Sequence, residues 1–176
     1  MALVPTIGVS VAVPEPWGSE LQQYRIGVGD GTARHIPTHI TLLPPHEVAQ
    51  EDLELAAEHL ADAARATEPF RVHLRGTGTF RPVSPVVFVN VVEGIAGCEQ
   101  LASDVRRGPL ALEAAFPYHP HVTVAHDLAE SELERAFVEL ERYDAAFDVD
   151  RMWMYVHDPV DGWQPMWSFP LGQVAD

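Results

Sequence analysis

With 176 residues, nearly half of them apolar, the chain is long enough for one folded domain and too apolar to be disordered. Its formal net charge of −15 argues against a broad groove for duplex nucleic acid, although a small anion can still bind in a locally neutral cleft. No apolar run approaches the roughly 20 residues of a membrane span, and residues 1–16 lack the basic start of a signal peptide. We therefore expect a cytoplasmic protein with no membrane partner.

The first half of the chain alternates between the periodicities of strands and helices. Apolar residues alternate with small ones over residues 6–13, which is typical of a strand. Residues 50–66 give the clearest helix, because apolar side chains recur on one face and acidic residues occupy the first turn. In chain order, the predicted elements are a strand at 6–13, a helix at 18–28, a strand at 38–43, a helix at 50–66, and strands at 70–80 and 85–92.

The second half repeats most of this order. It predicts a helix at 94–107, a strand at 119–125, a helix opened by a capping box from Ser131 to Glu134, and strands at about 146–157 and 163–171. Each half thus runs helix, strand, helix, strand, strand, and the leading strand at 6–13 has no evident counterpart. The long period excludes a solenoid and favours a duplicated, two-lobed domain.

Each half carries a His-x-Thr pair at the same place in this order. His39 and Thr41 share one face of their strand, and His121 and Thr123 share one face of theirs, because strand side chains alternate. A single pair is ordinary for a half-buried strand. Two pairs at matching places predict one cleft that both pairs face, provided that the halves pack around a pseudo-two-fold axis.

Two imidazoles and two hydroxyls in one cleft suit a phosphodiester. Displacement at phosphorus needs a base for the nucleophile and an acid for the leaving oxygen, and histidine can do either near pH 7. Hydroxyls can donate hydrogen bonds to the non-bridging oxygens. This chemistry requires no metal and no cofactor.

The sequences "HITL" and "HVTV" resemble the paired H-x-[ST]-apolar signatures of the 2H phosphoesterase superfamily. More narrowly, the chain resembles the bacterial 2′-5′ RNA ligase and cyclic phosphodiesterase-like proteins over nearly its whole length, including the turn at Phe80-Arg81-Pro82 and the aromatic-rich final hairpin. The resemblance implies one domain over residues 1–176, with motifs at 39–42 and 121–124. It implies an α+β fold in which antiparallel sheets flank a central cleft and helices lie outside.

The resemblance also implies roles for individual residues. His39 and His121 would be the acid-base pair, and Thr41 and Thr123 would hold the phosphate. For hydrolysis we expect His121 to activate water and His39 to protonate the leaving oxygen, and ligation would exchange these two roles. Tyr118 would either stack on a base or pack on the core, and Arg81 would either assist an anion or lie solvated in its turn. The expected substrate is a cyclic phosphate or 2′-5′ phosphodiester of a small nucleotide or RNA end.

Two alternatives stay open from the residues alone. His119 and His121 are spaced like ligands of a zinc hydrolase, although neither strand contains an acid. The fold could also bind a nucleotide or phosphometabolite without turnover, with the segments "RMWMYV" and "GWQPMW" as a binding wall. Two titrating imidazoles favour catalysis over binding alone.

Overall fold

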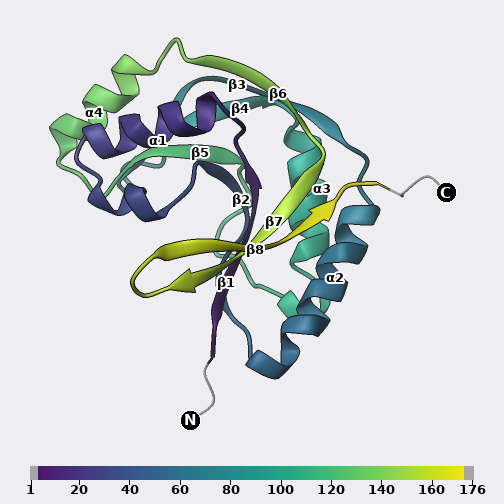
Figure 1. The fold of residues 1–176 in the computed structure, drawn as a ribbon. Helices are drawn as coiled ribbons and strands as arrows, with labels where there is room; N and C mark the ends of the chain where they lie inside the picture. The colour runs from purple at the N-terminus through teal and green to yellow at the C-terminus, as the bar shows by residue number, and fades with distance from the viewer. Residues whose placement is uncertain (1–3, 173–176) are drawn as a thin grey trace.

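The computed structural model describes residues 4–172, which form two four-stranded antiparallel sheets with four α-helices outside them (Figure 1). The strands are β1 (Thr6–Ala12), β2 (His39–Glu47), β3 (Phe70–Thr79), β4 (Val86–Glu93), β5 (His121–His126), β6 (Asp144–Val149), β7 (Arg151–Asp158) and β8 (Gly162–Pro170). The α-helices are α1 (Trp17–Gly27), α2 (Leu53–Arg65), α3 (Ile95–Val105) and α4 (Glu130–Glu139). Short 3₁₀ helices occupy Gly31–His35, Gln50–Asp52 and Gly108–Leu110. The predicted α+β fold is confirmed.

The two sheets have the orders β2-β1-β7-β8 and β5-β4-β3-β6. Both strands that carry a His-x-Thr pair are therefore edge strands, β2 in one sheet and β5 in the other. The edge position explains why β2 continues to Glu47, past the predicted end at 43. Pro44 and Pro45 lack an N–H, which an edge strand tolerates because one of its sides has no ladder partner.

The structure corrects two features of the predicted repeat. The leading strand does have a counterpart: β1 pairs with the motif strand β2, and β4 pairs with the motif strand β5 in the same antiparallel way. The expected strand at 146–157 is two strands that break at Asp150, with β6 pairing with β3 and β7 with β1. The repeating unit is therefore strand, helix, motif strand, helix.

Helices α1 and α3 each pack against the sheet other than the one whose strand they follow. Helix α1 follows a strand of the first sheet but contacts β5 of the second, whereas α3 follows a strand of the second sheet and contacts β2 of the first. Figure 1 shows α1 beside α4 on one side of the molecule, where Tyr24 donates to Glu139, and α2 beside α3 on the other. Leu60 of α2 and Leu101 of α3 are fully buried, and such burial contributes about 1.5–3 kcal/mol for each leucine.

Helix α4 begins one residue before the predicted capping box. Its N-cap is Ala129, and no side chain caps the helix, so Ser131 and Glu134 lie inside it and do not form the expected box. Two acidic residues, Glu130 and Glu132, instead occupy the first turn, where they interact favourably with the helix dipole. None of the helices between residues 4 and 172 is long and apolar enough to cross a bilayer.

Candidate active site

The two motif strands contact each other, and both His-x-Thr pairs line one cavity of about 270 Å³. His39 is the first residue of β2, and His121 is the first residue of β5. Thr41 and Thr123 follow two residues later on the same faces, as strand alternation predicts. The four side chains are half-buried, so they combine a fixed position with access from the cavity.

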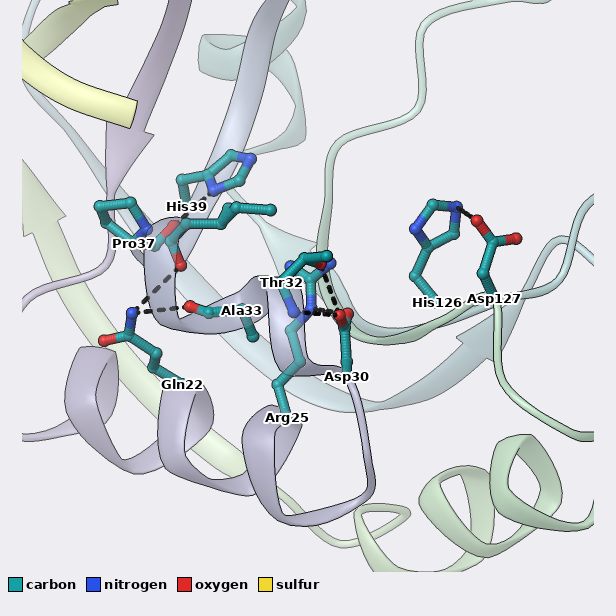
Figure 2. Close-up of polar contacts among 10 residues, drawn as sticks. Gln22, Arg25, Asp30, Thr32, Ala33, Pro37, His39, His126 and Asp127 are labelled. Atoms are coloured by element: carbon teal, nitrogen blue, oxygen red, sulfur yellow. Dashed lines mark hydrogen bonds and ion pairs between the residues drawn. The ribbon is translucent and has the colours of Figure 1, made fainter. Parts of the chain in front are cut away.

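His39 and His121 make the same kind of contact with the backbone. Nδ1 of His39 lies 2.6 Å from the carbonyl oxygen of Pro37, and Nδ1 of His121 lies 2.7 Å from that of His119 (Figure 2 draws the first). A carbonyl oxygen only accepts, so each Nδ1 donates its proton. In the neutral ring, Nε2 is then the lone acceptor, and neither Nε2 has a hydrogen-bond partner among residues 4–172.

Burial lowers the pKa of both histidines below the ordinary value of 6.5. For His39, the positive charge of Arg25 acts in the same direction, against the contact with Pro37. For His121, the neighbouring imidazoles of His119 and His39 add to the lowering. Part of the burial of His121 comes from aromatic rings, since Phe80 and Phe88 lie with their centroids 4.9 and 5.1 Å from it. Both imidazoles are therefore largely neutral at pH 7 in the free protein.

A bulge follows the threonine in each motif strand. Leu42 is an extra residue in the pairing of β2 with β1, and Val124 is an extra residue in the pairing of β5 with β4. Each bulge shifts the alternation by one residue, so Pro44 and His126, at equivalent positions, turn towards the cavity. Strict alternation from His121 places His126 on the opposite face, and for this reason the sequence did not predict it as a lining residue.

Two side chains support the bulge of β2 from behind. The hydroxyl of Tyr118 donates to the carbonyl oxygen of Thr41 at 2.7 Å, and Nε of Arg106 donates to that of Leu42 at 2.8 Å. The guanidinium of Arg106 also lies over the Tyr118 ring, 5.1 Å from its centroid. Tyr118 does not line the cavity, so its position favours the packing alternative over stacking on a base.

Arg81 is also absent from the cavity lining, although its neighbour Phe80 belongs to it. Its guanidinium pairs with Glu130 at 2.7 Å and Glu134 at 3.1 Å, and its Nε donates to Thr79. These contacts tie the turn between β3 and β4 to helix α4. The arginine is thus neither solvated, as one alternative held, nor among the residues around the motif pairs.

The cavity also contains residues that the sequence did not single out. Arg25 of α1 reaches it from a helix whose apolar stripe gave no sign of a functional side chain. Tyr155 and Trp163, from the two Trp-rich segments, also line the cavity. Trp163 lies close against β1 at Gly8, where an added Cβ would be only 3.3 Å from its ring.

The polar lining of the cavity is basic or neutral. It includes Arg25 and the histidines at 39, 121 and 126, but no aspartate or glutamate, in a chain with 26 acidic residues. The arrangement favours an anion. Within residues 4–172, no group of three or more His, Cys, Asp or Glu side chains is placed to hold a metal ion.

Known structures share this fold. The structure of Escherichia coli LigT complexed with 3′-AMP matches with a TM-score of 0.72 and 20% identity, covering 97% of this chain and 100% of that one. The same protein complexed with NADP+ matches with a TM-score of 0.69. The protein TT0787 of Thermus thermophilus matches with a TM-score of 0.66 and 22% identity, covering 96% of this chain and 100% of that one.

Sequence comparisons agree with the fold. A Bacillus cytotoxicus protein named "Putative phosphoesterase Bcer98_0945" is 29% identical over 140 residues, which cover 78% of this chain and 81% of the relative. A similarly named Oceanobacillus iheyensis protein is also 29% identical, over 78% of this chain and 82% of its own length. The family model for the 2′-5′ RNA ligase superfamily matches residues 13–161. The chain therefore belongs to the 2′-5′ RNA ligase superfamily of 2H phosphoesterases.

Proposed function

We propose that the protein is a metal-independent phosphoesterase that cleaves a cyclic phosphate or 2′-5′ phosphodiester in a nucleotide or RNA end. The observation that carries the proposal is the shared cavity, which His39 and Thr41 enter from one sheet and His121 and Thr123 from the other. Family membership supports phosphoester chemistry in general. The crystals of Escherichia coli LigT with 3′-AMP and NADP+ support a nucleotide as the substrate class.

In the proposed hydrolysis, Nε2 of His121 accepts a proton from water as the water oxygen attacks phosphorus. The bond from phosphorus to the leaving oxygen breaks, and His39 donates a proton to that oxygen from its own Nε2. The hydroxyls of Thr41 and Thr123 donate to the non-bridging oxygens, where the negative charge lies. The products are one phosphomonoester and one free hydroxyl.

The lowered pKa of both histidines suits a base but leaves the acid uncharged in the free protein. An anionic phosphate between the two rings stabilises an imidazolium, so substrate binding raises the pKa of the neighbouring histidine. The substrate thus supplies the protonated partner that the free site lacks. The −15 charge of the chain favours short substrates over long RNA.

The test is hydrolysis by the purified protein of nucleoside 2′,3′-cyclic phosphates and 2′-5′-linked dinucleotides, with 3′-5′-linked dinucleotides as the control. We expect turnover of at least one of the first two classes, unchanged by a chelator. Binding without turnover of any of them would indicate a nucleotide-binding protein. Loss of turnover in chelator, restored by a divalent metal, would instead indicate a metal hydrolase.

A further inference from the structure

Arg25 is a buried cation that points at the cavity from outside the motif strands. Arg25 is 8% exposed, and it lines the cavity together with Ile36 and Pro37. Its Nε donates to Asp30 at 2.7 Å, whereas its two terminal nitrogens have no hydrogen-bond partner among residues 4–172. One edge of the guanidinium is thus held by the protein, and the other is left to donate.

Asp30 fixes the orientation of that guanidinium. One carboxylate oxygen accepts from Arg25, and the other accepts from the backbone N–H of Thr32 at 3.2 Å and from its hydroxyl at 2.6 Å. Burial acts to raise the pKa of Asp30, but the hydrogen bonds from Thr32 and Arg25 outweigh it and leave this pKa below its ordinary value. The carboxylate therefore stays ionised at neutral pH and holds Arg25 in place. Figure 2 shows this cluster between His39 and His126.

Arg25 differs from Arg106, which also lies at the end of a helix before a motif strand. Arg25 is in the last turn of α1, and Arg106 is the C-cap residue of α3. Arg106 donates to the backbone of β2 and packs on Tyr118, which is a structural role. In the part of the chain that the structure describes, Arg25 makes no such contact with a strand, so its free edge is available for a ligand.

The hydrolysis proposed above leaves the free edge of Arg25 without a partner. The motif quartet of two imidazoles and two hydroxyls already serves one phosphoryl group, and Arg25 reaches the cavity from α1, not from β2 or β5. The cavity of about 270 Å³ has room for more than a phosphate ion and has an aromatic wall at Tyr155 and Trp163. Arginine binds phosphate oxygens through paired N–H groups, which is the geometry that the free edge offers.

We propose that Arg25 forms a second anion subsite, which binds a phosphate separated from the reacting phosphodiester by one nucleoside. Building on the function proposed above, the preferred substrate is a 5′-phosphorylated nucleoside cyclic phosphate or the equivalent 3′ end of an RNA. A cyclic phosphate of an unphosphorylated nucleoside fills only the motif quartet. Arg25 is therefore a residue that determines substrate specificity.

Calorimetric titration tests the subsite with two probes, adenosine 3′-monophosphate and adenosine 3′,5′-bisphosphate. The wild-type protein should bind the bisphosphate about tenfold or more tightly, the effect of one added charge-assisted contact. Arg25→Gln should abolish that preference and leave the affinity for the monophosphate within about twofold. Arg25→Lys should restore it only in part, because an ammonium lacks the two-pronged geometry.

Two further variants keep the test interpretable. Arg25→Gln leaves the buried carboxylate of Asp30 without its cation, which can destabilise the fold. The double variant Arg25→Gln/Asp30→Asn removes both charges and should show the same loss of preference for the bisphosphate. Arg135→Gln removes one exposed positive charge on α4 and should keep the wild-type preference, which separates a local contact from net charge.

Three results would overturn the subsite. The first is a wild-type protein that binds neither probe or binds both equally well. The second is an Arg25 variant that still prefers the bisphosphate. The third is an Arg25 variant whose affinity for both probes falls equally, which would place Arg25 on the reacting phosphate. The titration measures binding alone. A protein that prefers the bisphosphate but cleaves no phosphodiester would therefore contradict the proposed function and leave the subsite standing.

Discussion

His39 and His121 are held by one contact repeated in two sheets, since each Nδ1 donates to the carbonyl oxygen two residues earlier, at 2.6 and 2.7 Å. The contact fixes the tautomer and the ring orientation together, so both rings keep Nε2 as the acceptor. Because β2 and β5 are edge strands of separate sheets and contact each other, the repeat places two imidazoles of the same tautomer at one cavity.

The two threonine hydroxyls should matter less than the imidazoles but more than ordinary surface residues. Thr41→Val and Thr123→Val remove a donor to a phosphoryl oxygen while keeping the branched shape that suits a strand. We expect each to lower kcat by about 10-fold to 10³-fold. Steady-state kinetics with a cyclic nucleotide measures the loss. Thr41→Ser and Thr123→Ser should recover most of it, and a valine variant with full turnover would remove that threonine from the mechanism.

The pH dependence of turnover should be bell-shaped, with one histidine neutral and one protonated. Burial lowers the pKa of both below 6.5 in the free protein, so the maximum of kcat/KM should fall below pH 6.5. The maximum of kcat should lie at higher pH, because bound phosphate stabilises the imidazolium. Rate profiles at limiting and saturating substrate give the two maxima. A kcat/KM maximum above pH 7 would contradict the inferred environments.

The same lowered pKa values predict an acid-sensitive fold. Between the folded pKa of these histidines and the unfolded value near 6.5, the unfolded chain binds more protons than the native protein. The free energy of unfolding should therefore fall as the pH drops from about 6.5 and stop falling below the folded pKa values. Urea denaturation at a series of pH values measures this slope. His39→Gln/His121→Gln should flatten it, and an unchanged slope would show that other groups cause it.

Tyr118→Phe tests whether this side chain supports the site from behind. The change deletes the hydroxyl that donates to the Thr41 carbonyl and keeps the ring beneath Arg106. We expect the free energy of unfolding to drop by about 0.5–1.5 kcal/mol, as for a lost buried hydrogen bond, with substrate KM nearly unchanged. Chemical denaturation and steady-state kinetics give the two quantities. A large rise in KM with unchanged stability would favour direct contact with substrate.

The sequence predicted those parts of the site that depend on local periodicity. Strand alternation placed His39 with Thr41 and His121 with Thr123, and the duplicated order of elements indicated that the pairs meet. It missed His126, because a bulge at Val124 shifts the alternation and such bulges arise from pairing with a neighbouring strand.

Other features were missed because they depend on contacts between distant segments. The buried positions of the final strands change phase at Asp150, from Val149 to Met152, and this shift marks where the chain leaves one sheet for the other. Arg25 is a single basic residue near the end of a helix, where arginine is ordinarily exposed. Only the pairing of Asp30 with it and the crossing of α1 to the other sheet make it a lining residue.

The central claim is that His39 and His121 act together on one phosphodiester, and it is tested most directly by the turnover of alanine variants on a nucleoside 2′,3′-cyclic phosphate. His39→Ala and His121→Ala should each lower kcat by about 10²–10⁴-fold. The double variant should lose little more than either single one, because groups that work as a unit are not additive. His73→Ala, whose side chain pairs with Asp144 away from the cavity, should keep wild-type turnover. Wild-type turnover in either His39→Ala or His121→Ala would contradict the claim.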